Sequence, residues 1–171
     1  FGVAVDGTGR VIVTDASTGG VFRNLMNPGA SATIVVLFRA TTATIYNWLL
    51  GHAWNASLGY VNYRIINGLY AESPDNVNRV GVDRSLNTTY FVAWKKDVER
   101  STYSLYVNGI KYTANAWSDP AKNNSAAALE FPGCFGYSYY PMRGYMSDMA
   151  IFARALSDAD IERLYQLAVL G

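Results

Sequence analysis

The sequence predicts an all-β sandwich that is closed by one short C-terminal helix. Aromatic residues make up 14% of the 171 residues, and 13 of these aromatics are Tyr. Together with recurrent Thr and Val, they suit pleated, half-buried strands. After Ser157 the periodicity changes from that of a strand to that of a helix. The apolar residues then follow one helical face at i, i+3, i+4 and i+7: Ile161, Leu164, Tyr165 and Ala168.

The opening of the chain contains a predicted hairpin and a predicted buried strand. Residues 1–5 and 10–14 are β-prone runs that flank the turn-like sequence Asp-Gly-Thr-Gly, so we expect them to pair as a hairpin. After a loop at residues 15–20, residues 32–38 are apolar on both faces and rich in β-branched side chains. This run predicts a fully buried central strand.

The middle of the chain is predicted to form strands that are joined by tight turns. Asn67-Gly68 is a strong signal for a two-residue hairpin, because both residues tolerate positive φ. Asn108-Gly109 marks a second hairpin of the same kind. Between residues 44 and 138, the predicted strands are residues 44–50, 58–66, 69–72, 77–82, 89–95, 102–108, 111–113, 126–131 and 134–138.

Two polar segments separate these strands. Residues 96–100 are charged and are expected to form a solvated turn between two paired strands, not a binding patch. Residues 115–125 lack strand periodicity and predict a long surface loop, a type of segment that often carries function.

The chain ends in a closing strand and a helix. Met149 and Ile151 lie two apart, the period of a strand with one buried face. The helix is expected over residues 157–169, with Ser157 as its N-cap. Two first-turn carboxylates would meet the positive end of the helix dipole: Asp158 and Asp160.

Charge and cysteine content exclude several classes of function. The formal net charge is +1 and no basic run exceeds Lys95-Lys96, so nucleic acid and anionic membranes are not expected partners. No apolar run is long enough to span a bilayer, so membrane insertion is not expected. Cys134 is the single cysteine, which excludes an internal disulfide. Without an initiator Met or signal peptide, residues 1–171 are expected to be a single domain of a larger protein or assembly.

Motifs in the second half of the chain resemble the laminin-G-like, concanavalin-A-like jelly-roll domains. Leu-Tyr-Val-Asn-Gly at residues 105–109 resembles the hairpin of that family, and residues 90–94 match the strand before it. Residues 133–137 and 144–165 resemble its last strands and its ending. The resemblance implies a two-sheet antiparallel jelly roll with a short C-terminal helix. It specifies the fold better than the function, because one fold hosts many functions.

The sequence contains few of the residues that a catalytic site would require. His52 is the only histidine, and no nucleophile elbow accompanies it. Glycoside hydrolases that resemble this family carry clustered acids in a pattern like E-x-D-x-x-E, which is absent here. The sequence therefore predicts that the protein is not an enzyme, and a degenerate glycoside hydrolase is the third-ranked alternative.

The resemblance also implies a structural Ca²⁺, held by oxygen ligands from an early loop and an acid on the closing strand. Ser147 stands where the family has its acid, and Asp148 follows one place later, where strand alternation points it to the other face. The candidate metal ligands are Asp6, Asp15 and Asp148. No other cofactor is expected.

Sugar recognition without catalysis needs aromatic platforms and planar polar groups that hydrogen-bond hydroxyls. The predicted loops supply aromatics among Asn, Ser and Asp residues. The candidate ligand-binding residues are Trp54, Tyr63, Arg64, Trp117, Tyr139, Tyr140 and Arg143.

The leading hypothesis is thus a non-catalytic carbohydrate-binding or adhesion module. Its partner would be a glycan or cell-surface polysaccharide, and its location extracellular, on a cell surface or on a virion surface. The alternative is a structural or decoration domain of a virion or other surface assembly, which would pack against neighbouring protein subunits.

Overall fold

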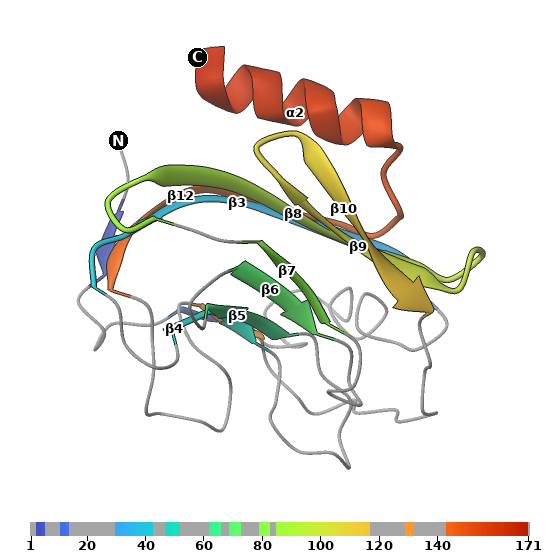
Figure 1. The fold of residues 1–171 in the computed structure, drawn as a ribbon, viewed down its shortest axis with the longest axis horizontal. Coiled ribbons are helices and arrows are strands. Elements are labelled where there is room, and N and C mark those ends of the chain that lie inside the picture. The colour runs from blue at the N-terminus through green and yellow to red at the C-terminus, as the bar shows by residue number, and fades with distance from the viewer. Residues whose placement is uncertain are drawn as a thin grey trace.

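The computed structural model is a two-layer antiparallel β-sandwich with one C-terminal helix outside the layers (Figure 1). Each layer is a six-stranded sheet. This architecture confirms the all-β jelly-roll prediction. The structure describes residues 3–5, 11–13, 30–42, 47–51, 62–65, 69–72, 79–82, 85–116, 129–131 and 143–170.

The sheet beneath the helix has the strand order β1-β12-β3-β8-β9-β10, and we call it the helix-bearing sheet. Its strands are β1 (Val3–Val5), β12 (Gly144–Phe152), β3 (Ala32–Ala40), β8 (Thr89–Asp97), β9 (Thr102–Val107) and β10 (Ile110–Ala116).

The second sheet has the order β2-β11-β4-β5-β6-β7. Its strands are β2 (Val11–Val13), β11 (Leu129–Phe131), β4 (Asn47–Gly51), β5 (Asn62–Ile65), β6 (Leu69–Glu72) and β7 (Arg79–Val82). β5 and β6 pair antiparallel, as the hairpin predicted at Asn67-Gly68 requires. Ile65 is opposite Leu69, so three residues and not the predicted two separate the paired positions, and residues 66–68 themselves lie outside the described part.

The predicted opening hairpin is wrong. β1 pairs with β12, with Val3 opposite Met146, whereas β2 pairs with β11, with Val11 opposite Phe131. The two runs therefore belong to different sheets. Turn chemistry predicts where a chain can reverse, but burial between the layers decides which partner each strand takes.

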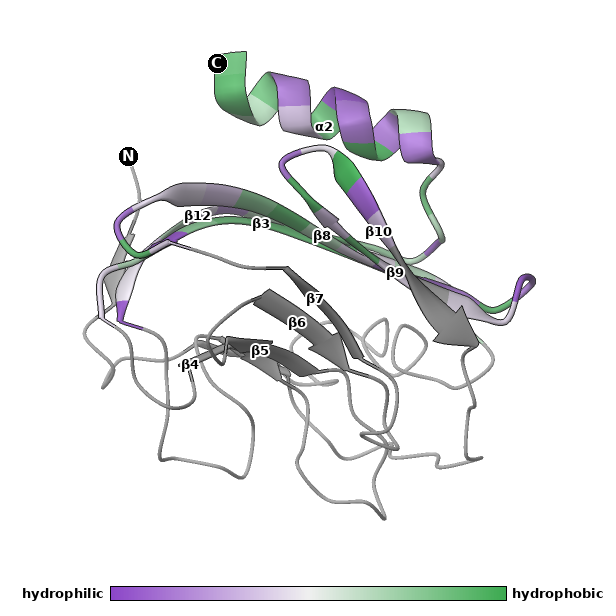
Figure 2. Cartoon of the chain, viewed as in Figure 1, coloured by the Kyte–Doolittle hydropathy of each residue, from purple (hydrophilic) through white to green (hydrophobic). Residues whose placement is uncertain are grey.

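β3 confirms the prediction of a buried central strand. It lies between β12 and β8, and its alternate side chains serve two different apolar interfaces. Val35 belongs to the cluster beneath the helix, whereas Ile34 and Val36, which are also buried, point to the opposite face of the sheet. Figure 2 shows the resulting long hydrophobic runs on β3 and β8.

The β9–β10 turn adopts the conformation that its sequence predicts. Asn108 and Gly109 have φ angles of 50° and 79°, and Val107 pairs with Ile110 across them. The Asn108 side chain also accepts a hydrogen bond of 2.9 Å from the Phe91 backbone N–H. Gly109 lies against the helix, because a Cβ at this position would collide with the side chains of Glu162 and Tyr165.

Gly109→Ala is expected to lower the free energy of unfolding by about 2 kcal/mol, because alanine is strained at positive φ and its methyl group would meet the helix. Chemical denaturation measures the change. The adjacent Ile110 is 60% exposed, so Ile110→Thr should change stability by less than about 0.5 kcal/mol. Equal losses in the two variants would contradict the assigned turn geometry.

The charged segment at residues 96–100 differs from the expected solvated turn. Lys95, Lys96 and Asp97 all belong to β8 and are only 6%, 2% and 3% exposed. Strand pairing continues to Asp97 opposite Thr102, so only the residues between them form the turn. The Asp97 carboxylate accepts hydrogen bonds from the backbone and the side chain of Arg100, at 3.2 and 2.6 Å, which satisfies its buried charge.

Helix α2 (Asp158–Leu170) begins with the predicted N-cap. The Asp160 backbone N–H donates to Ser157 Oγ at 3.0 Å, and the Ser157 N–H donates to Asp160 Oδ2 at 3.2 Å. This reciprocal pair is a capping box, which satisfies two backbone donors at the helix start. The structure thus assigns Asp160 a capping role and leaves Asp158 for contacts with the sheet.

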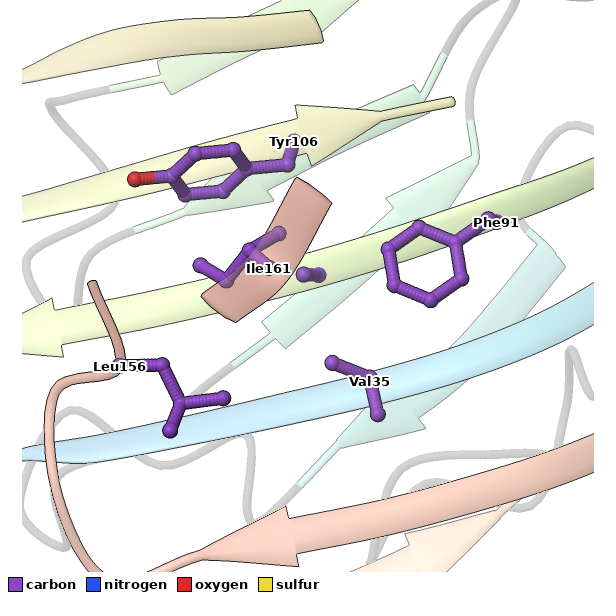
Figure 3. Close-up of a cluster of buried hydrophobic side chains, with 6 residues drawn as sticks. Val35, Phe91, Tyr106, Leu156 and Ile161 are labelled. Carbon is purple, nitrogen blue, oxygen red and sulfur yellow. The ribbon is translucent and has the colours of Figure 1, made fainter. Parts of the chain in front are cut away.

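The predicted apolar stripe attaches α2 to the sheet face that points away from the second sheet (Figure 1). Ile161 is fully buried, and Figure 3 shows it above Val35 and between Tyr106 and Phe91. The Tyr165 ring lies 5.7 Å from the Phe91 ring, centroid to centroid. The cluster consists of Val35, Phe91, Ala93, Tyr106, Leu156 and Ile161, with Leu164, Tyr165 and Ala168 packed against it.

Ile161→Ala is expected to lower the free energy of unfolding by about 2–4 kcal/mol, because it leaves a cavity in a fully buried contact. Leu167 is on the same helix but 64% exposed, so Leu167→Ala serves as the matched control and should have little effect. Thermal or chemical unfolding distinguishes the two variants. A small loss for Ile161→Ala would mean that α2 does not dock as described.

Candidate functional site

The structure describes only some of the predicted ligand-binding residues. Tyr63 and Arg64 are consecutive residues of β5, and Tyr63 pairs with Leu50 on β4 and with Ala71 on β6, within the second sheet. The other aromatic candidates, Trp54, Trp117, Tyr139 and Tyr140, lie outside the described residues. Their convergence on one surface therefore stays a prediction.

Arg143 is the remaining predicted ligand-binding residue, and it lies at the entrance to β12 with an exposed side chain. Its carbonyl oxygen accepts a hydrogen bond of 3.0 Å from the Thr41 backbone N–H, which ties it to the end of β3. Gly144 follows it at a φ of 151°, where an added Cβ would collide with the Arg39 carbonyl. The backbone that carries Arg143 is thus closely fitted to β3.

The metal candidate Asp148 lies in a β-bulge of β12. Ser147 pairs with Leu37 and Ala150 pairs with Val35, so Asp148 and Met149 together stand opposite a single residue of β3. Asp148 has a φ of 48° and an exposed side chain. Its orientation follows from this bulge and not from simple strand alternation.

The calcium prediction is not tested further by this structure. Asp6 and Asp15 lie outside the described residues. Within the part of the chain that is described, no group of three or more metal-ligating side chains comes together. A Ca²⁺ site that includes Asp148 therefore remains a prediction.

A polar cavity that the sequence did not predict lies where the start of α2 meets β8, β9 and β10. Its volume is about 510 Å³. We call it the helix-start cavity. Its ionisable lining residues are Lys95, Asp97, Arg100, Lys111, Arg154, Asp158 and Asp160, and its hydroxyl-bearing residues are Thr102, Ser104 and Ser157.

The Asp158 carboxylate joins three strands to the helix at one wall of this cavity. Oδ1 accepts hydrogen bonds from Lys95 Nζ at 2.7 Å and from the Tyr106 hydroxyl at 2.6 Å, and Oδ2 accepts from Lys111 Nζ at 2.8 Å. Burial alone would raise the pKa of Asp158, but the three donors outweigh it and hold the pKa well below its usual value. The carboxylate is therefore ionised at neutral pH.

The partners of Asp158 are themselves constrained. The Lys95 side chain is only 7% exposed, and the ion pair with Asp158 compensates its charge. Its Nζ also lies 5.3 Å from the centroid of the Tyr106 ring, within cation–π range. Burial and the bond to Asp158 raise the pKa of the Tyr106 hydroxyl, which stays a hydrogen-bond donor.

Asp158→Asn is expected to lower the free energy of unfolding at pH 7 by about 1–2 kcal/mol, since the ion pair is lost while the site is partly open to solvent. Because the folded state depresses this pKa, the stabilisation is present above about pH 3.9 and is lost as the pH falls toward the lower folded-state value. The difference in the free energy of unfolding between wild type and Asp158→Asn should therefore become smaller in acid.

Denaturation curves between pH 7 and pH 2 measure this difference. Glu162→Gln, an exposed charge removal on the same helix, should change stability by less than about 0.5 kcal/mol. A gap between wild type and Asp158→Asn that stays constant down to pH 2 would contradict the ionic role.

The carboxylates of the helix-start cavity are unsuited to acid catalysis. Glycoside hydrolysis needs one carboxyl whose pKa is raised, so that it holds a proton to donate. Hydrogen bonds and nearby cations instead lower the pKa values of Asp97, Asp158 and Asp160. The cavity offers fixed charges and hydroxyl groups, and none of these three carboxyls has a raised pKa.

Sequence reasoning missed this cavity because its parts are far apart in the chain. Lys95 and Asp158 are separated by 63 positions, and only the packing of α2 on the sheet brings them together. The available signals were local: basic and acidic residues at the end of a strand, and an acid in the first turn of a helix. Neither signal shows which distant residue the charged side chain contacts in the folded protein.

Comparison with solved structures supports the fold. The CBM40 module of the Ruminococcus gnavus IT-sialidase bound to α2,3 sialyllactose superposes with a TM-score of 0.75 at 17% identity over 96% of both chains. Domain 4 of AbnA, a GH43 extracellular arabinanase from Geobacillus stearothermophilus, in complex with arabinotriose, has a TM-score of 0.70 at 12% identity, covering 95% of this chain and 75% of that one.

A heptameric SAP-like pentraxin from Limulus polyphemus shares the fold at a TM-score of 0.62 and 11% identity, with 80% of this chain and 70% of that chain covered. No family model and no curated protein sequence matches this chain. At these identities, the structural likeness establishes the fold. In the described part of the chain, no helix is long and apolar enough to cross a membrane.

Proposed function

We propose that this chain is a non-catalytic carbohydrate-binding module. The observation that carries the proposal is the likeness over 96% of both chains to a module that was solved with sialyllactose bound. The arabinanase domain solved with arabinotriose has the same fold and a different sugar, so the fold accommodates more than one class of glycan.

The proposed contacts to glycan are the aromatic and arginine side chains identified from the sequence. Aromatic rings offer flat apolar surfaces to sugar rings, and arginine donates to carboxylates and adjacent hydroxyls. The proposed partner is a glycan outside the cell or on its surface, and residues 1–171 would act as one module. The proposed contact residues are Trp54, Tyr63, Arg64, Trp117, Tyr139, Tyr140 and Arg143.

A glycan array that includes sialylated and neutral oligosaccharides tests the proposal, run once with calcium and once with a chelator. Binding is expected to at least one glycan class, and Trp117→Ala and Tyr140→Ala should each weaken it about tenfold or more, because stacking and burial of an aromatic ring are lost. Tyr145→Ala removes an exposed tyrosine that is not a proposed contact and should leave binding unchanged.

Three outcomes separate the alternatives. Binding that persists with the chelator defines a metal-independent module. Loss of binding with the chelator would support the predicted calcium site. No binding to any glycan contradicts the proposal and favours a domain that packs against protein subunits. Turnover of any oligosaccharide would contradict the assignment as non-catalytic.

A further inference from the structure

Two arginine side chains line the helix-start cavity with most of their donors available. Arg154, in the segment between β12 and α2, approaches Asp160 at 3.8 Å, which is beyond hydrogen-bonding distance. Among the described residues, its guanidinium makes no recorded hydrogen bond, and its side chain is 67% exposed. Arg100, from the β8–β9 turn, gives only Nη1 to Asp97. Each guanidinium carries five N–H donors in a planar fork.

The charges that line the cavity do not cancel. Asp158 alone compensates both Lys95 and Lys111, while Asp97 is paired with Arg100. Asp160 is also hydrogen-bonded to the Ser157 N–H as part of the capping box. Arg154 is within ion-pair distance of Asp160, at 3.8 Å. Four cationic and three anionic side chains line the cavity, so its lining carries one net positive charge.

We propose that the helix-start cavity binds an oxyanion group, a carboxylate, sulfate or phosphate, through the guanidinium groups of Arg154 and Arg100. A planar fork matches the paired oxygens of these groups, and each hydrogen bond would be charge-assisted. A cation is disfavoured by the excess positive charge. The hydroxyls of Thr102 and Ser104 on the cavity wall suit polar groups on the rest of the ligand.

The cavity lies on a different layer from Tyr63 and Arg64, two of the proposed glycan contacts. It lies at the start of α2, on the sheet face that carries the helix, whereas Tyr63 and Arg64 belong to the second sheet (Figure 1). It is also large enough for more than a bare ion, since small-molecule pockets span about 300–1,000 Å³. Oxyanion binding here therefore requires neither Tyr63 nor Arg64.

Titration of the whole chain with sodium sulfate, phosphate and acetate, followed through the arginine Nε–Hε signals by NMR, tests the proposal. Ionic strength is held constant with chloride, because exposed charges are screened by salt. At least one anion should give saturable shifts of Arg154 and Arg100. The tetrahedral anions and acetate distinguish a sulfate or phosphate ligand from a carboxylate.

Arg154→Gln should weaken binding about tenfold or more, because it removes a charge-assisted donor pair. Arg100→Lys preserves the charge beside Asp97 and should still weaken binding, since the fork is lost. Arg163→Gln removes an equal charge from the exposed face of α2 outside the cavity and should leave the affinity unchanged. Thermal unfolding confirms that each variant is folded.

Two results would overturn the proposal. One is the absence of saturable shifts with all three anions. The other is an equal effect of Arg154→Gln and Arg163→Gln, which would indicate non-specific attraction to positive charge. Glycan binding measured on the same variants stays a separate readout, so failure of one proposal does not decide the other.

Discussion

The packing of α2 on the helix-bearing sheet is the interaction on which the described part of the molecule depends. It combines a fully buried apolar contact at Ile161 with an ionic contact at Asp158. The apolar contact gives the helix its attachment, because burial of aliphatic surface is non-directional and favourable. The ionic contact fixes the orientation of the helix, because one carboxylate accepts hydrogen bonds from donors on β8, β9 and β10.

This division explains why buried charge is tolerated so close to the core. Lys95 and Asp97 follow Ala93 on the β8 face that carries the helix, and both are almost completely buried. A buried charge is costly unless it is paired and hydrogen-bonded, and the start of α2 and the β8–β9 turn supply the partners. The helix-start cavity lies beside these pairs, and all four of their side chains line it.

The sandwich leaves two different surfaces for recognition. The helix-bearing sheet is covered along part of its outer face by α2, and its cavity is lined by fixed charges. The second sheet carries the strand with Tyr63 and Arg64. These two candidate residues and the helix-start cavity therefore belong to different layers.

The sequence by itself determined the features that depend on neighbouring residues. The N-cap at Ser157, the stripe that includes Ile161 and the turn at Asn108-Gly109 follow from local hydrogen bonding, helical period and positive φ. The order of the motifs also indicated the two-sheet fold. These signals are strong because each is complete within a few positions of the chain.

Only the tertiary structure decided which distant segments meet. β1 and β2 separate into different sheets, and the register of β12 is altered by the bulge at Asp148. The helix-start cavity assembles from a strand end, a turn and a helix start that no local pattern connects. The physical reason is that burial between layers and charge pairing act through space, so they select partners that sequence periodicity does not specify.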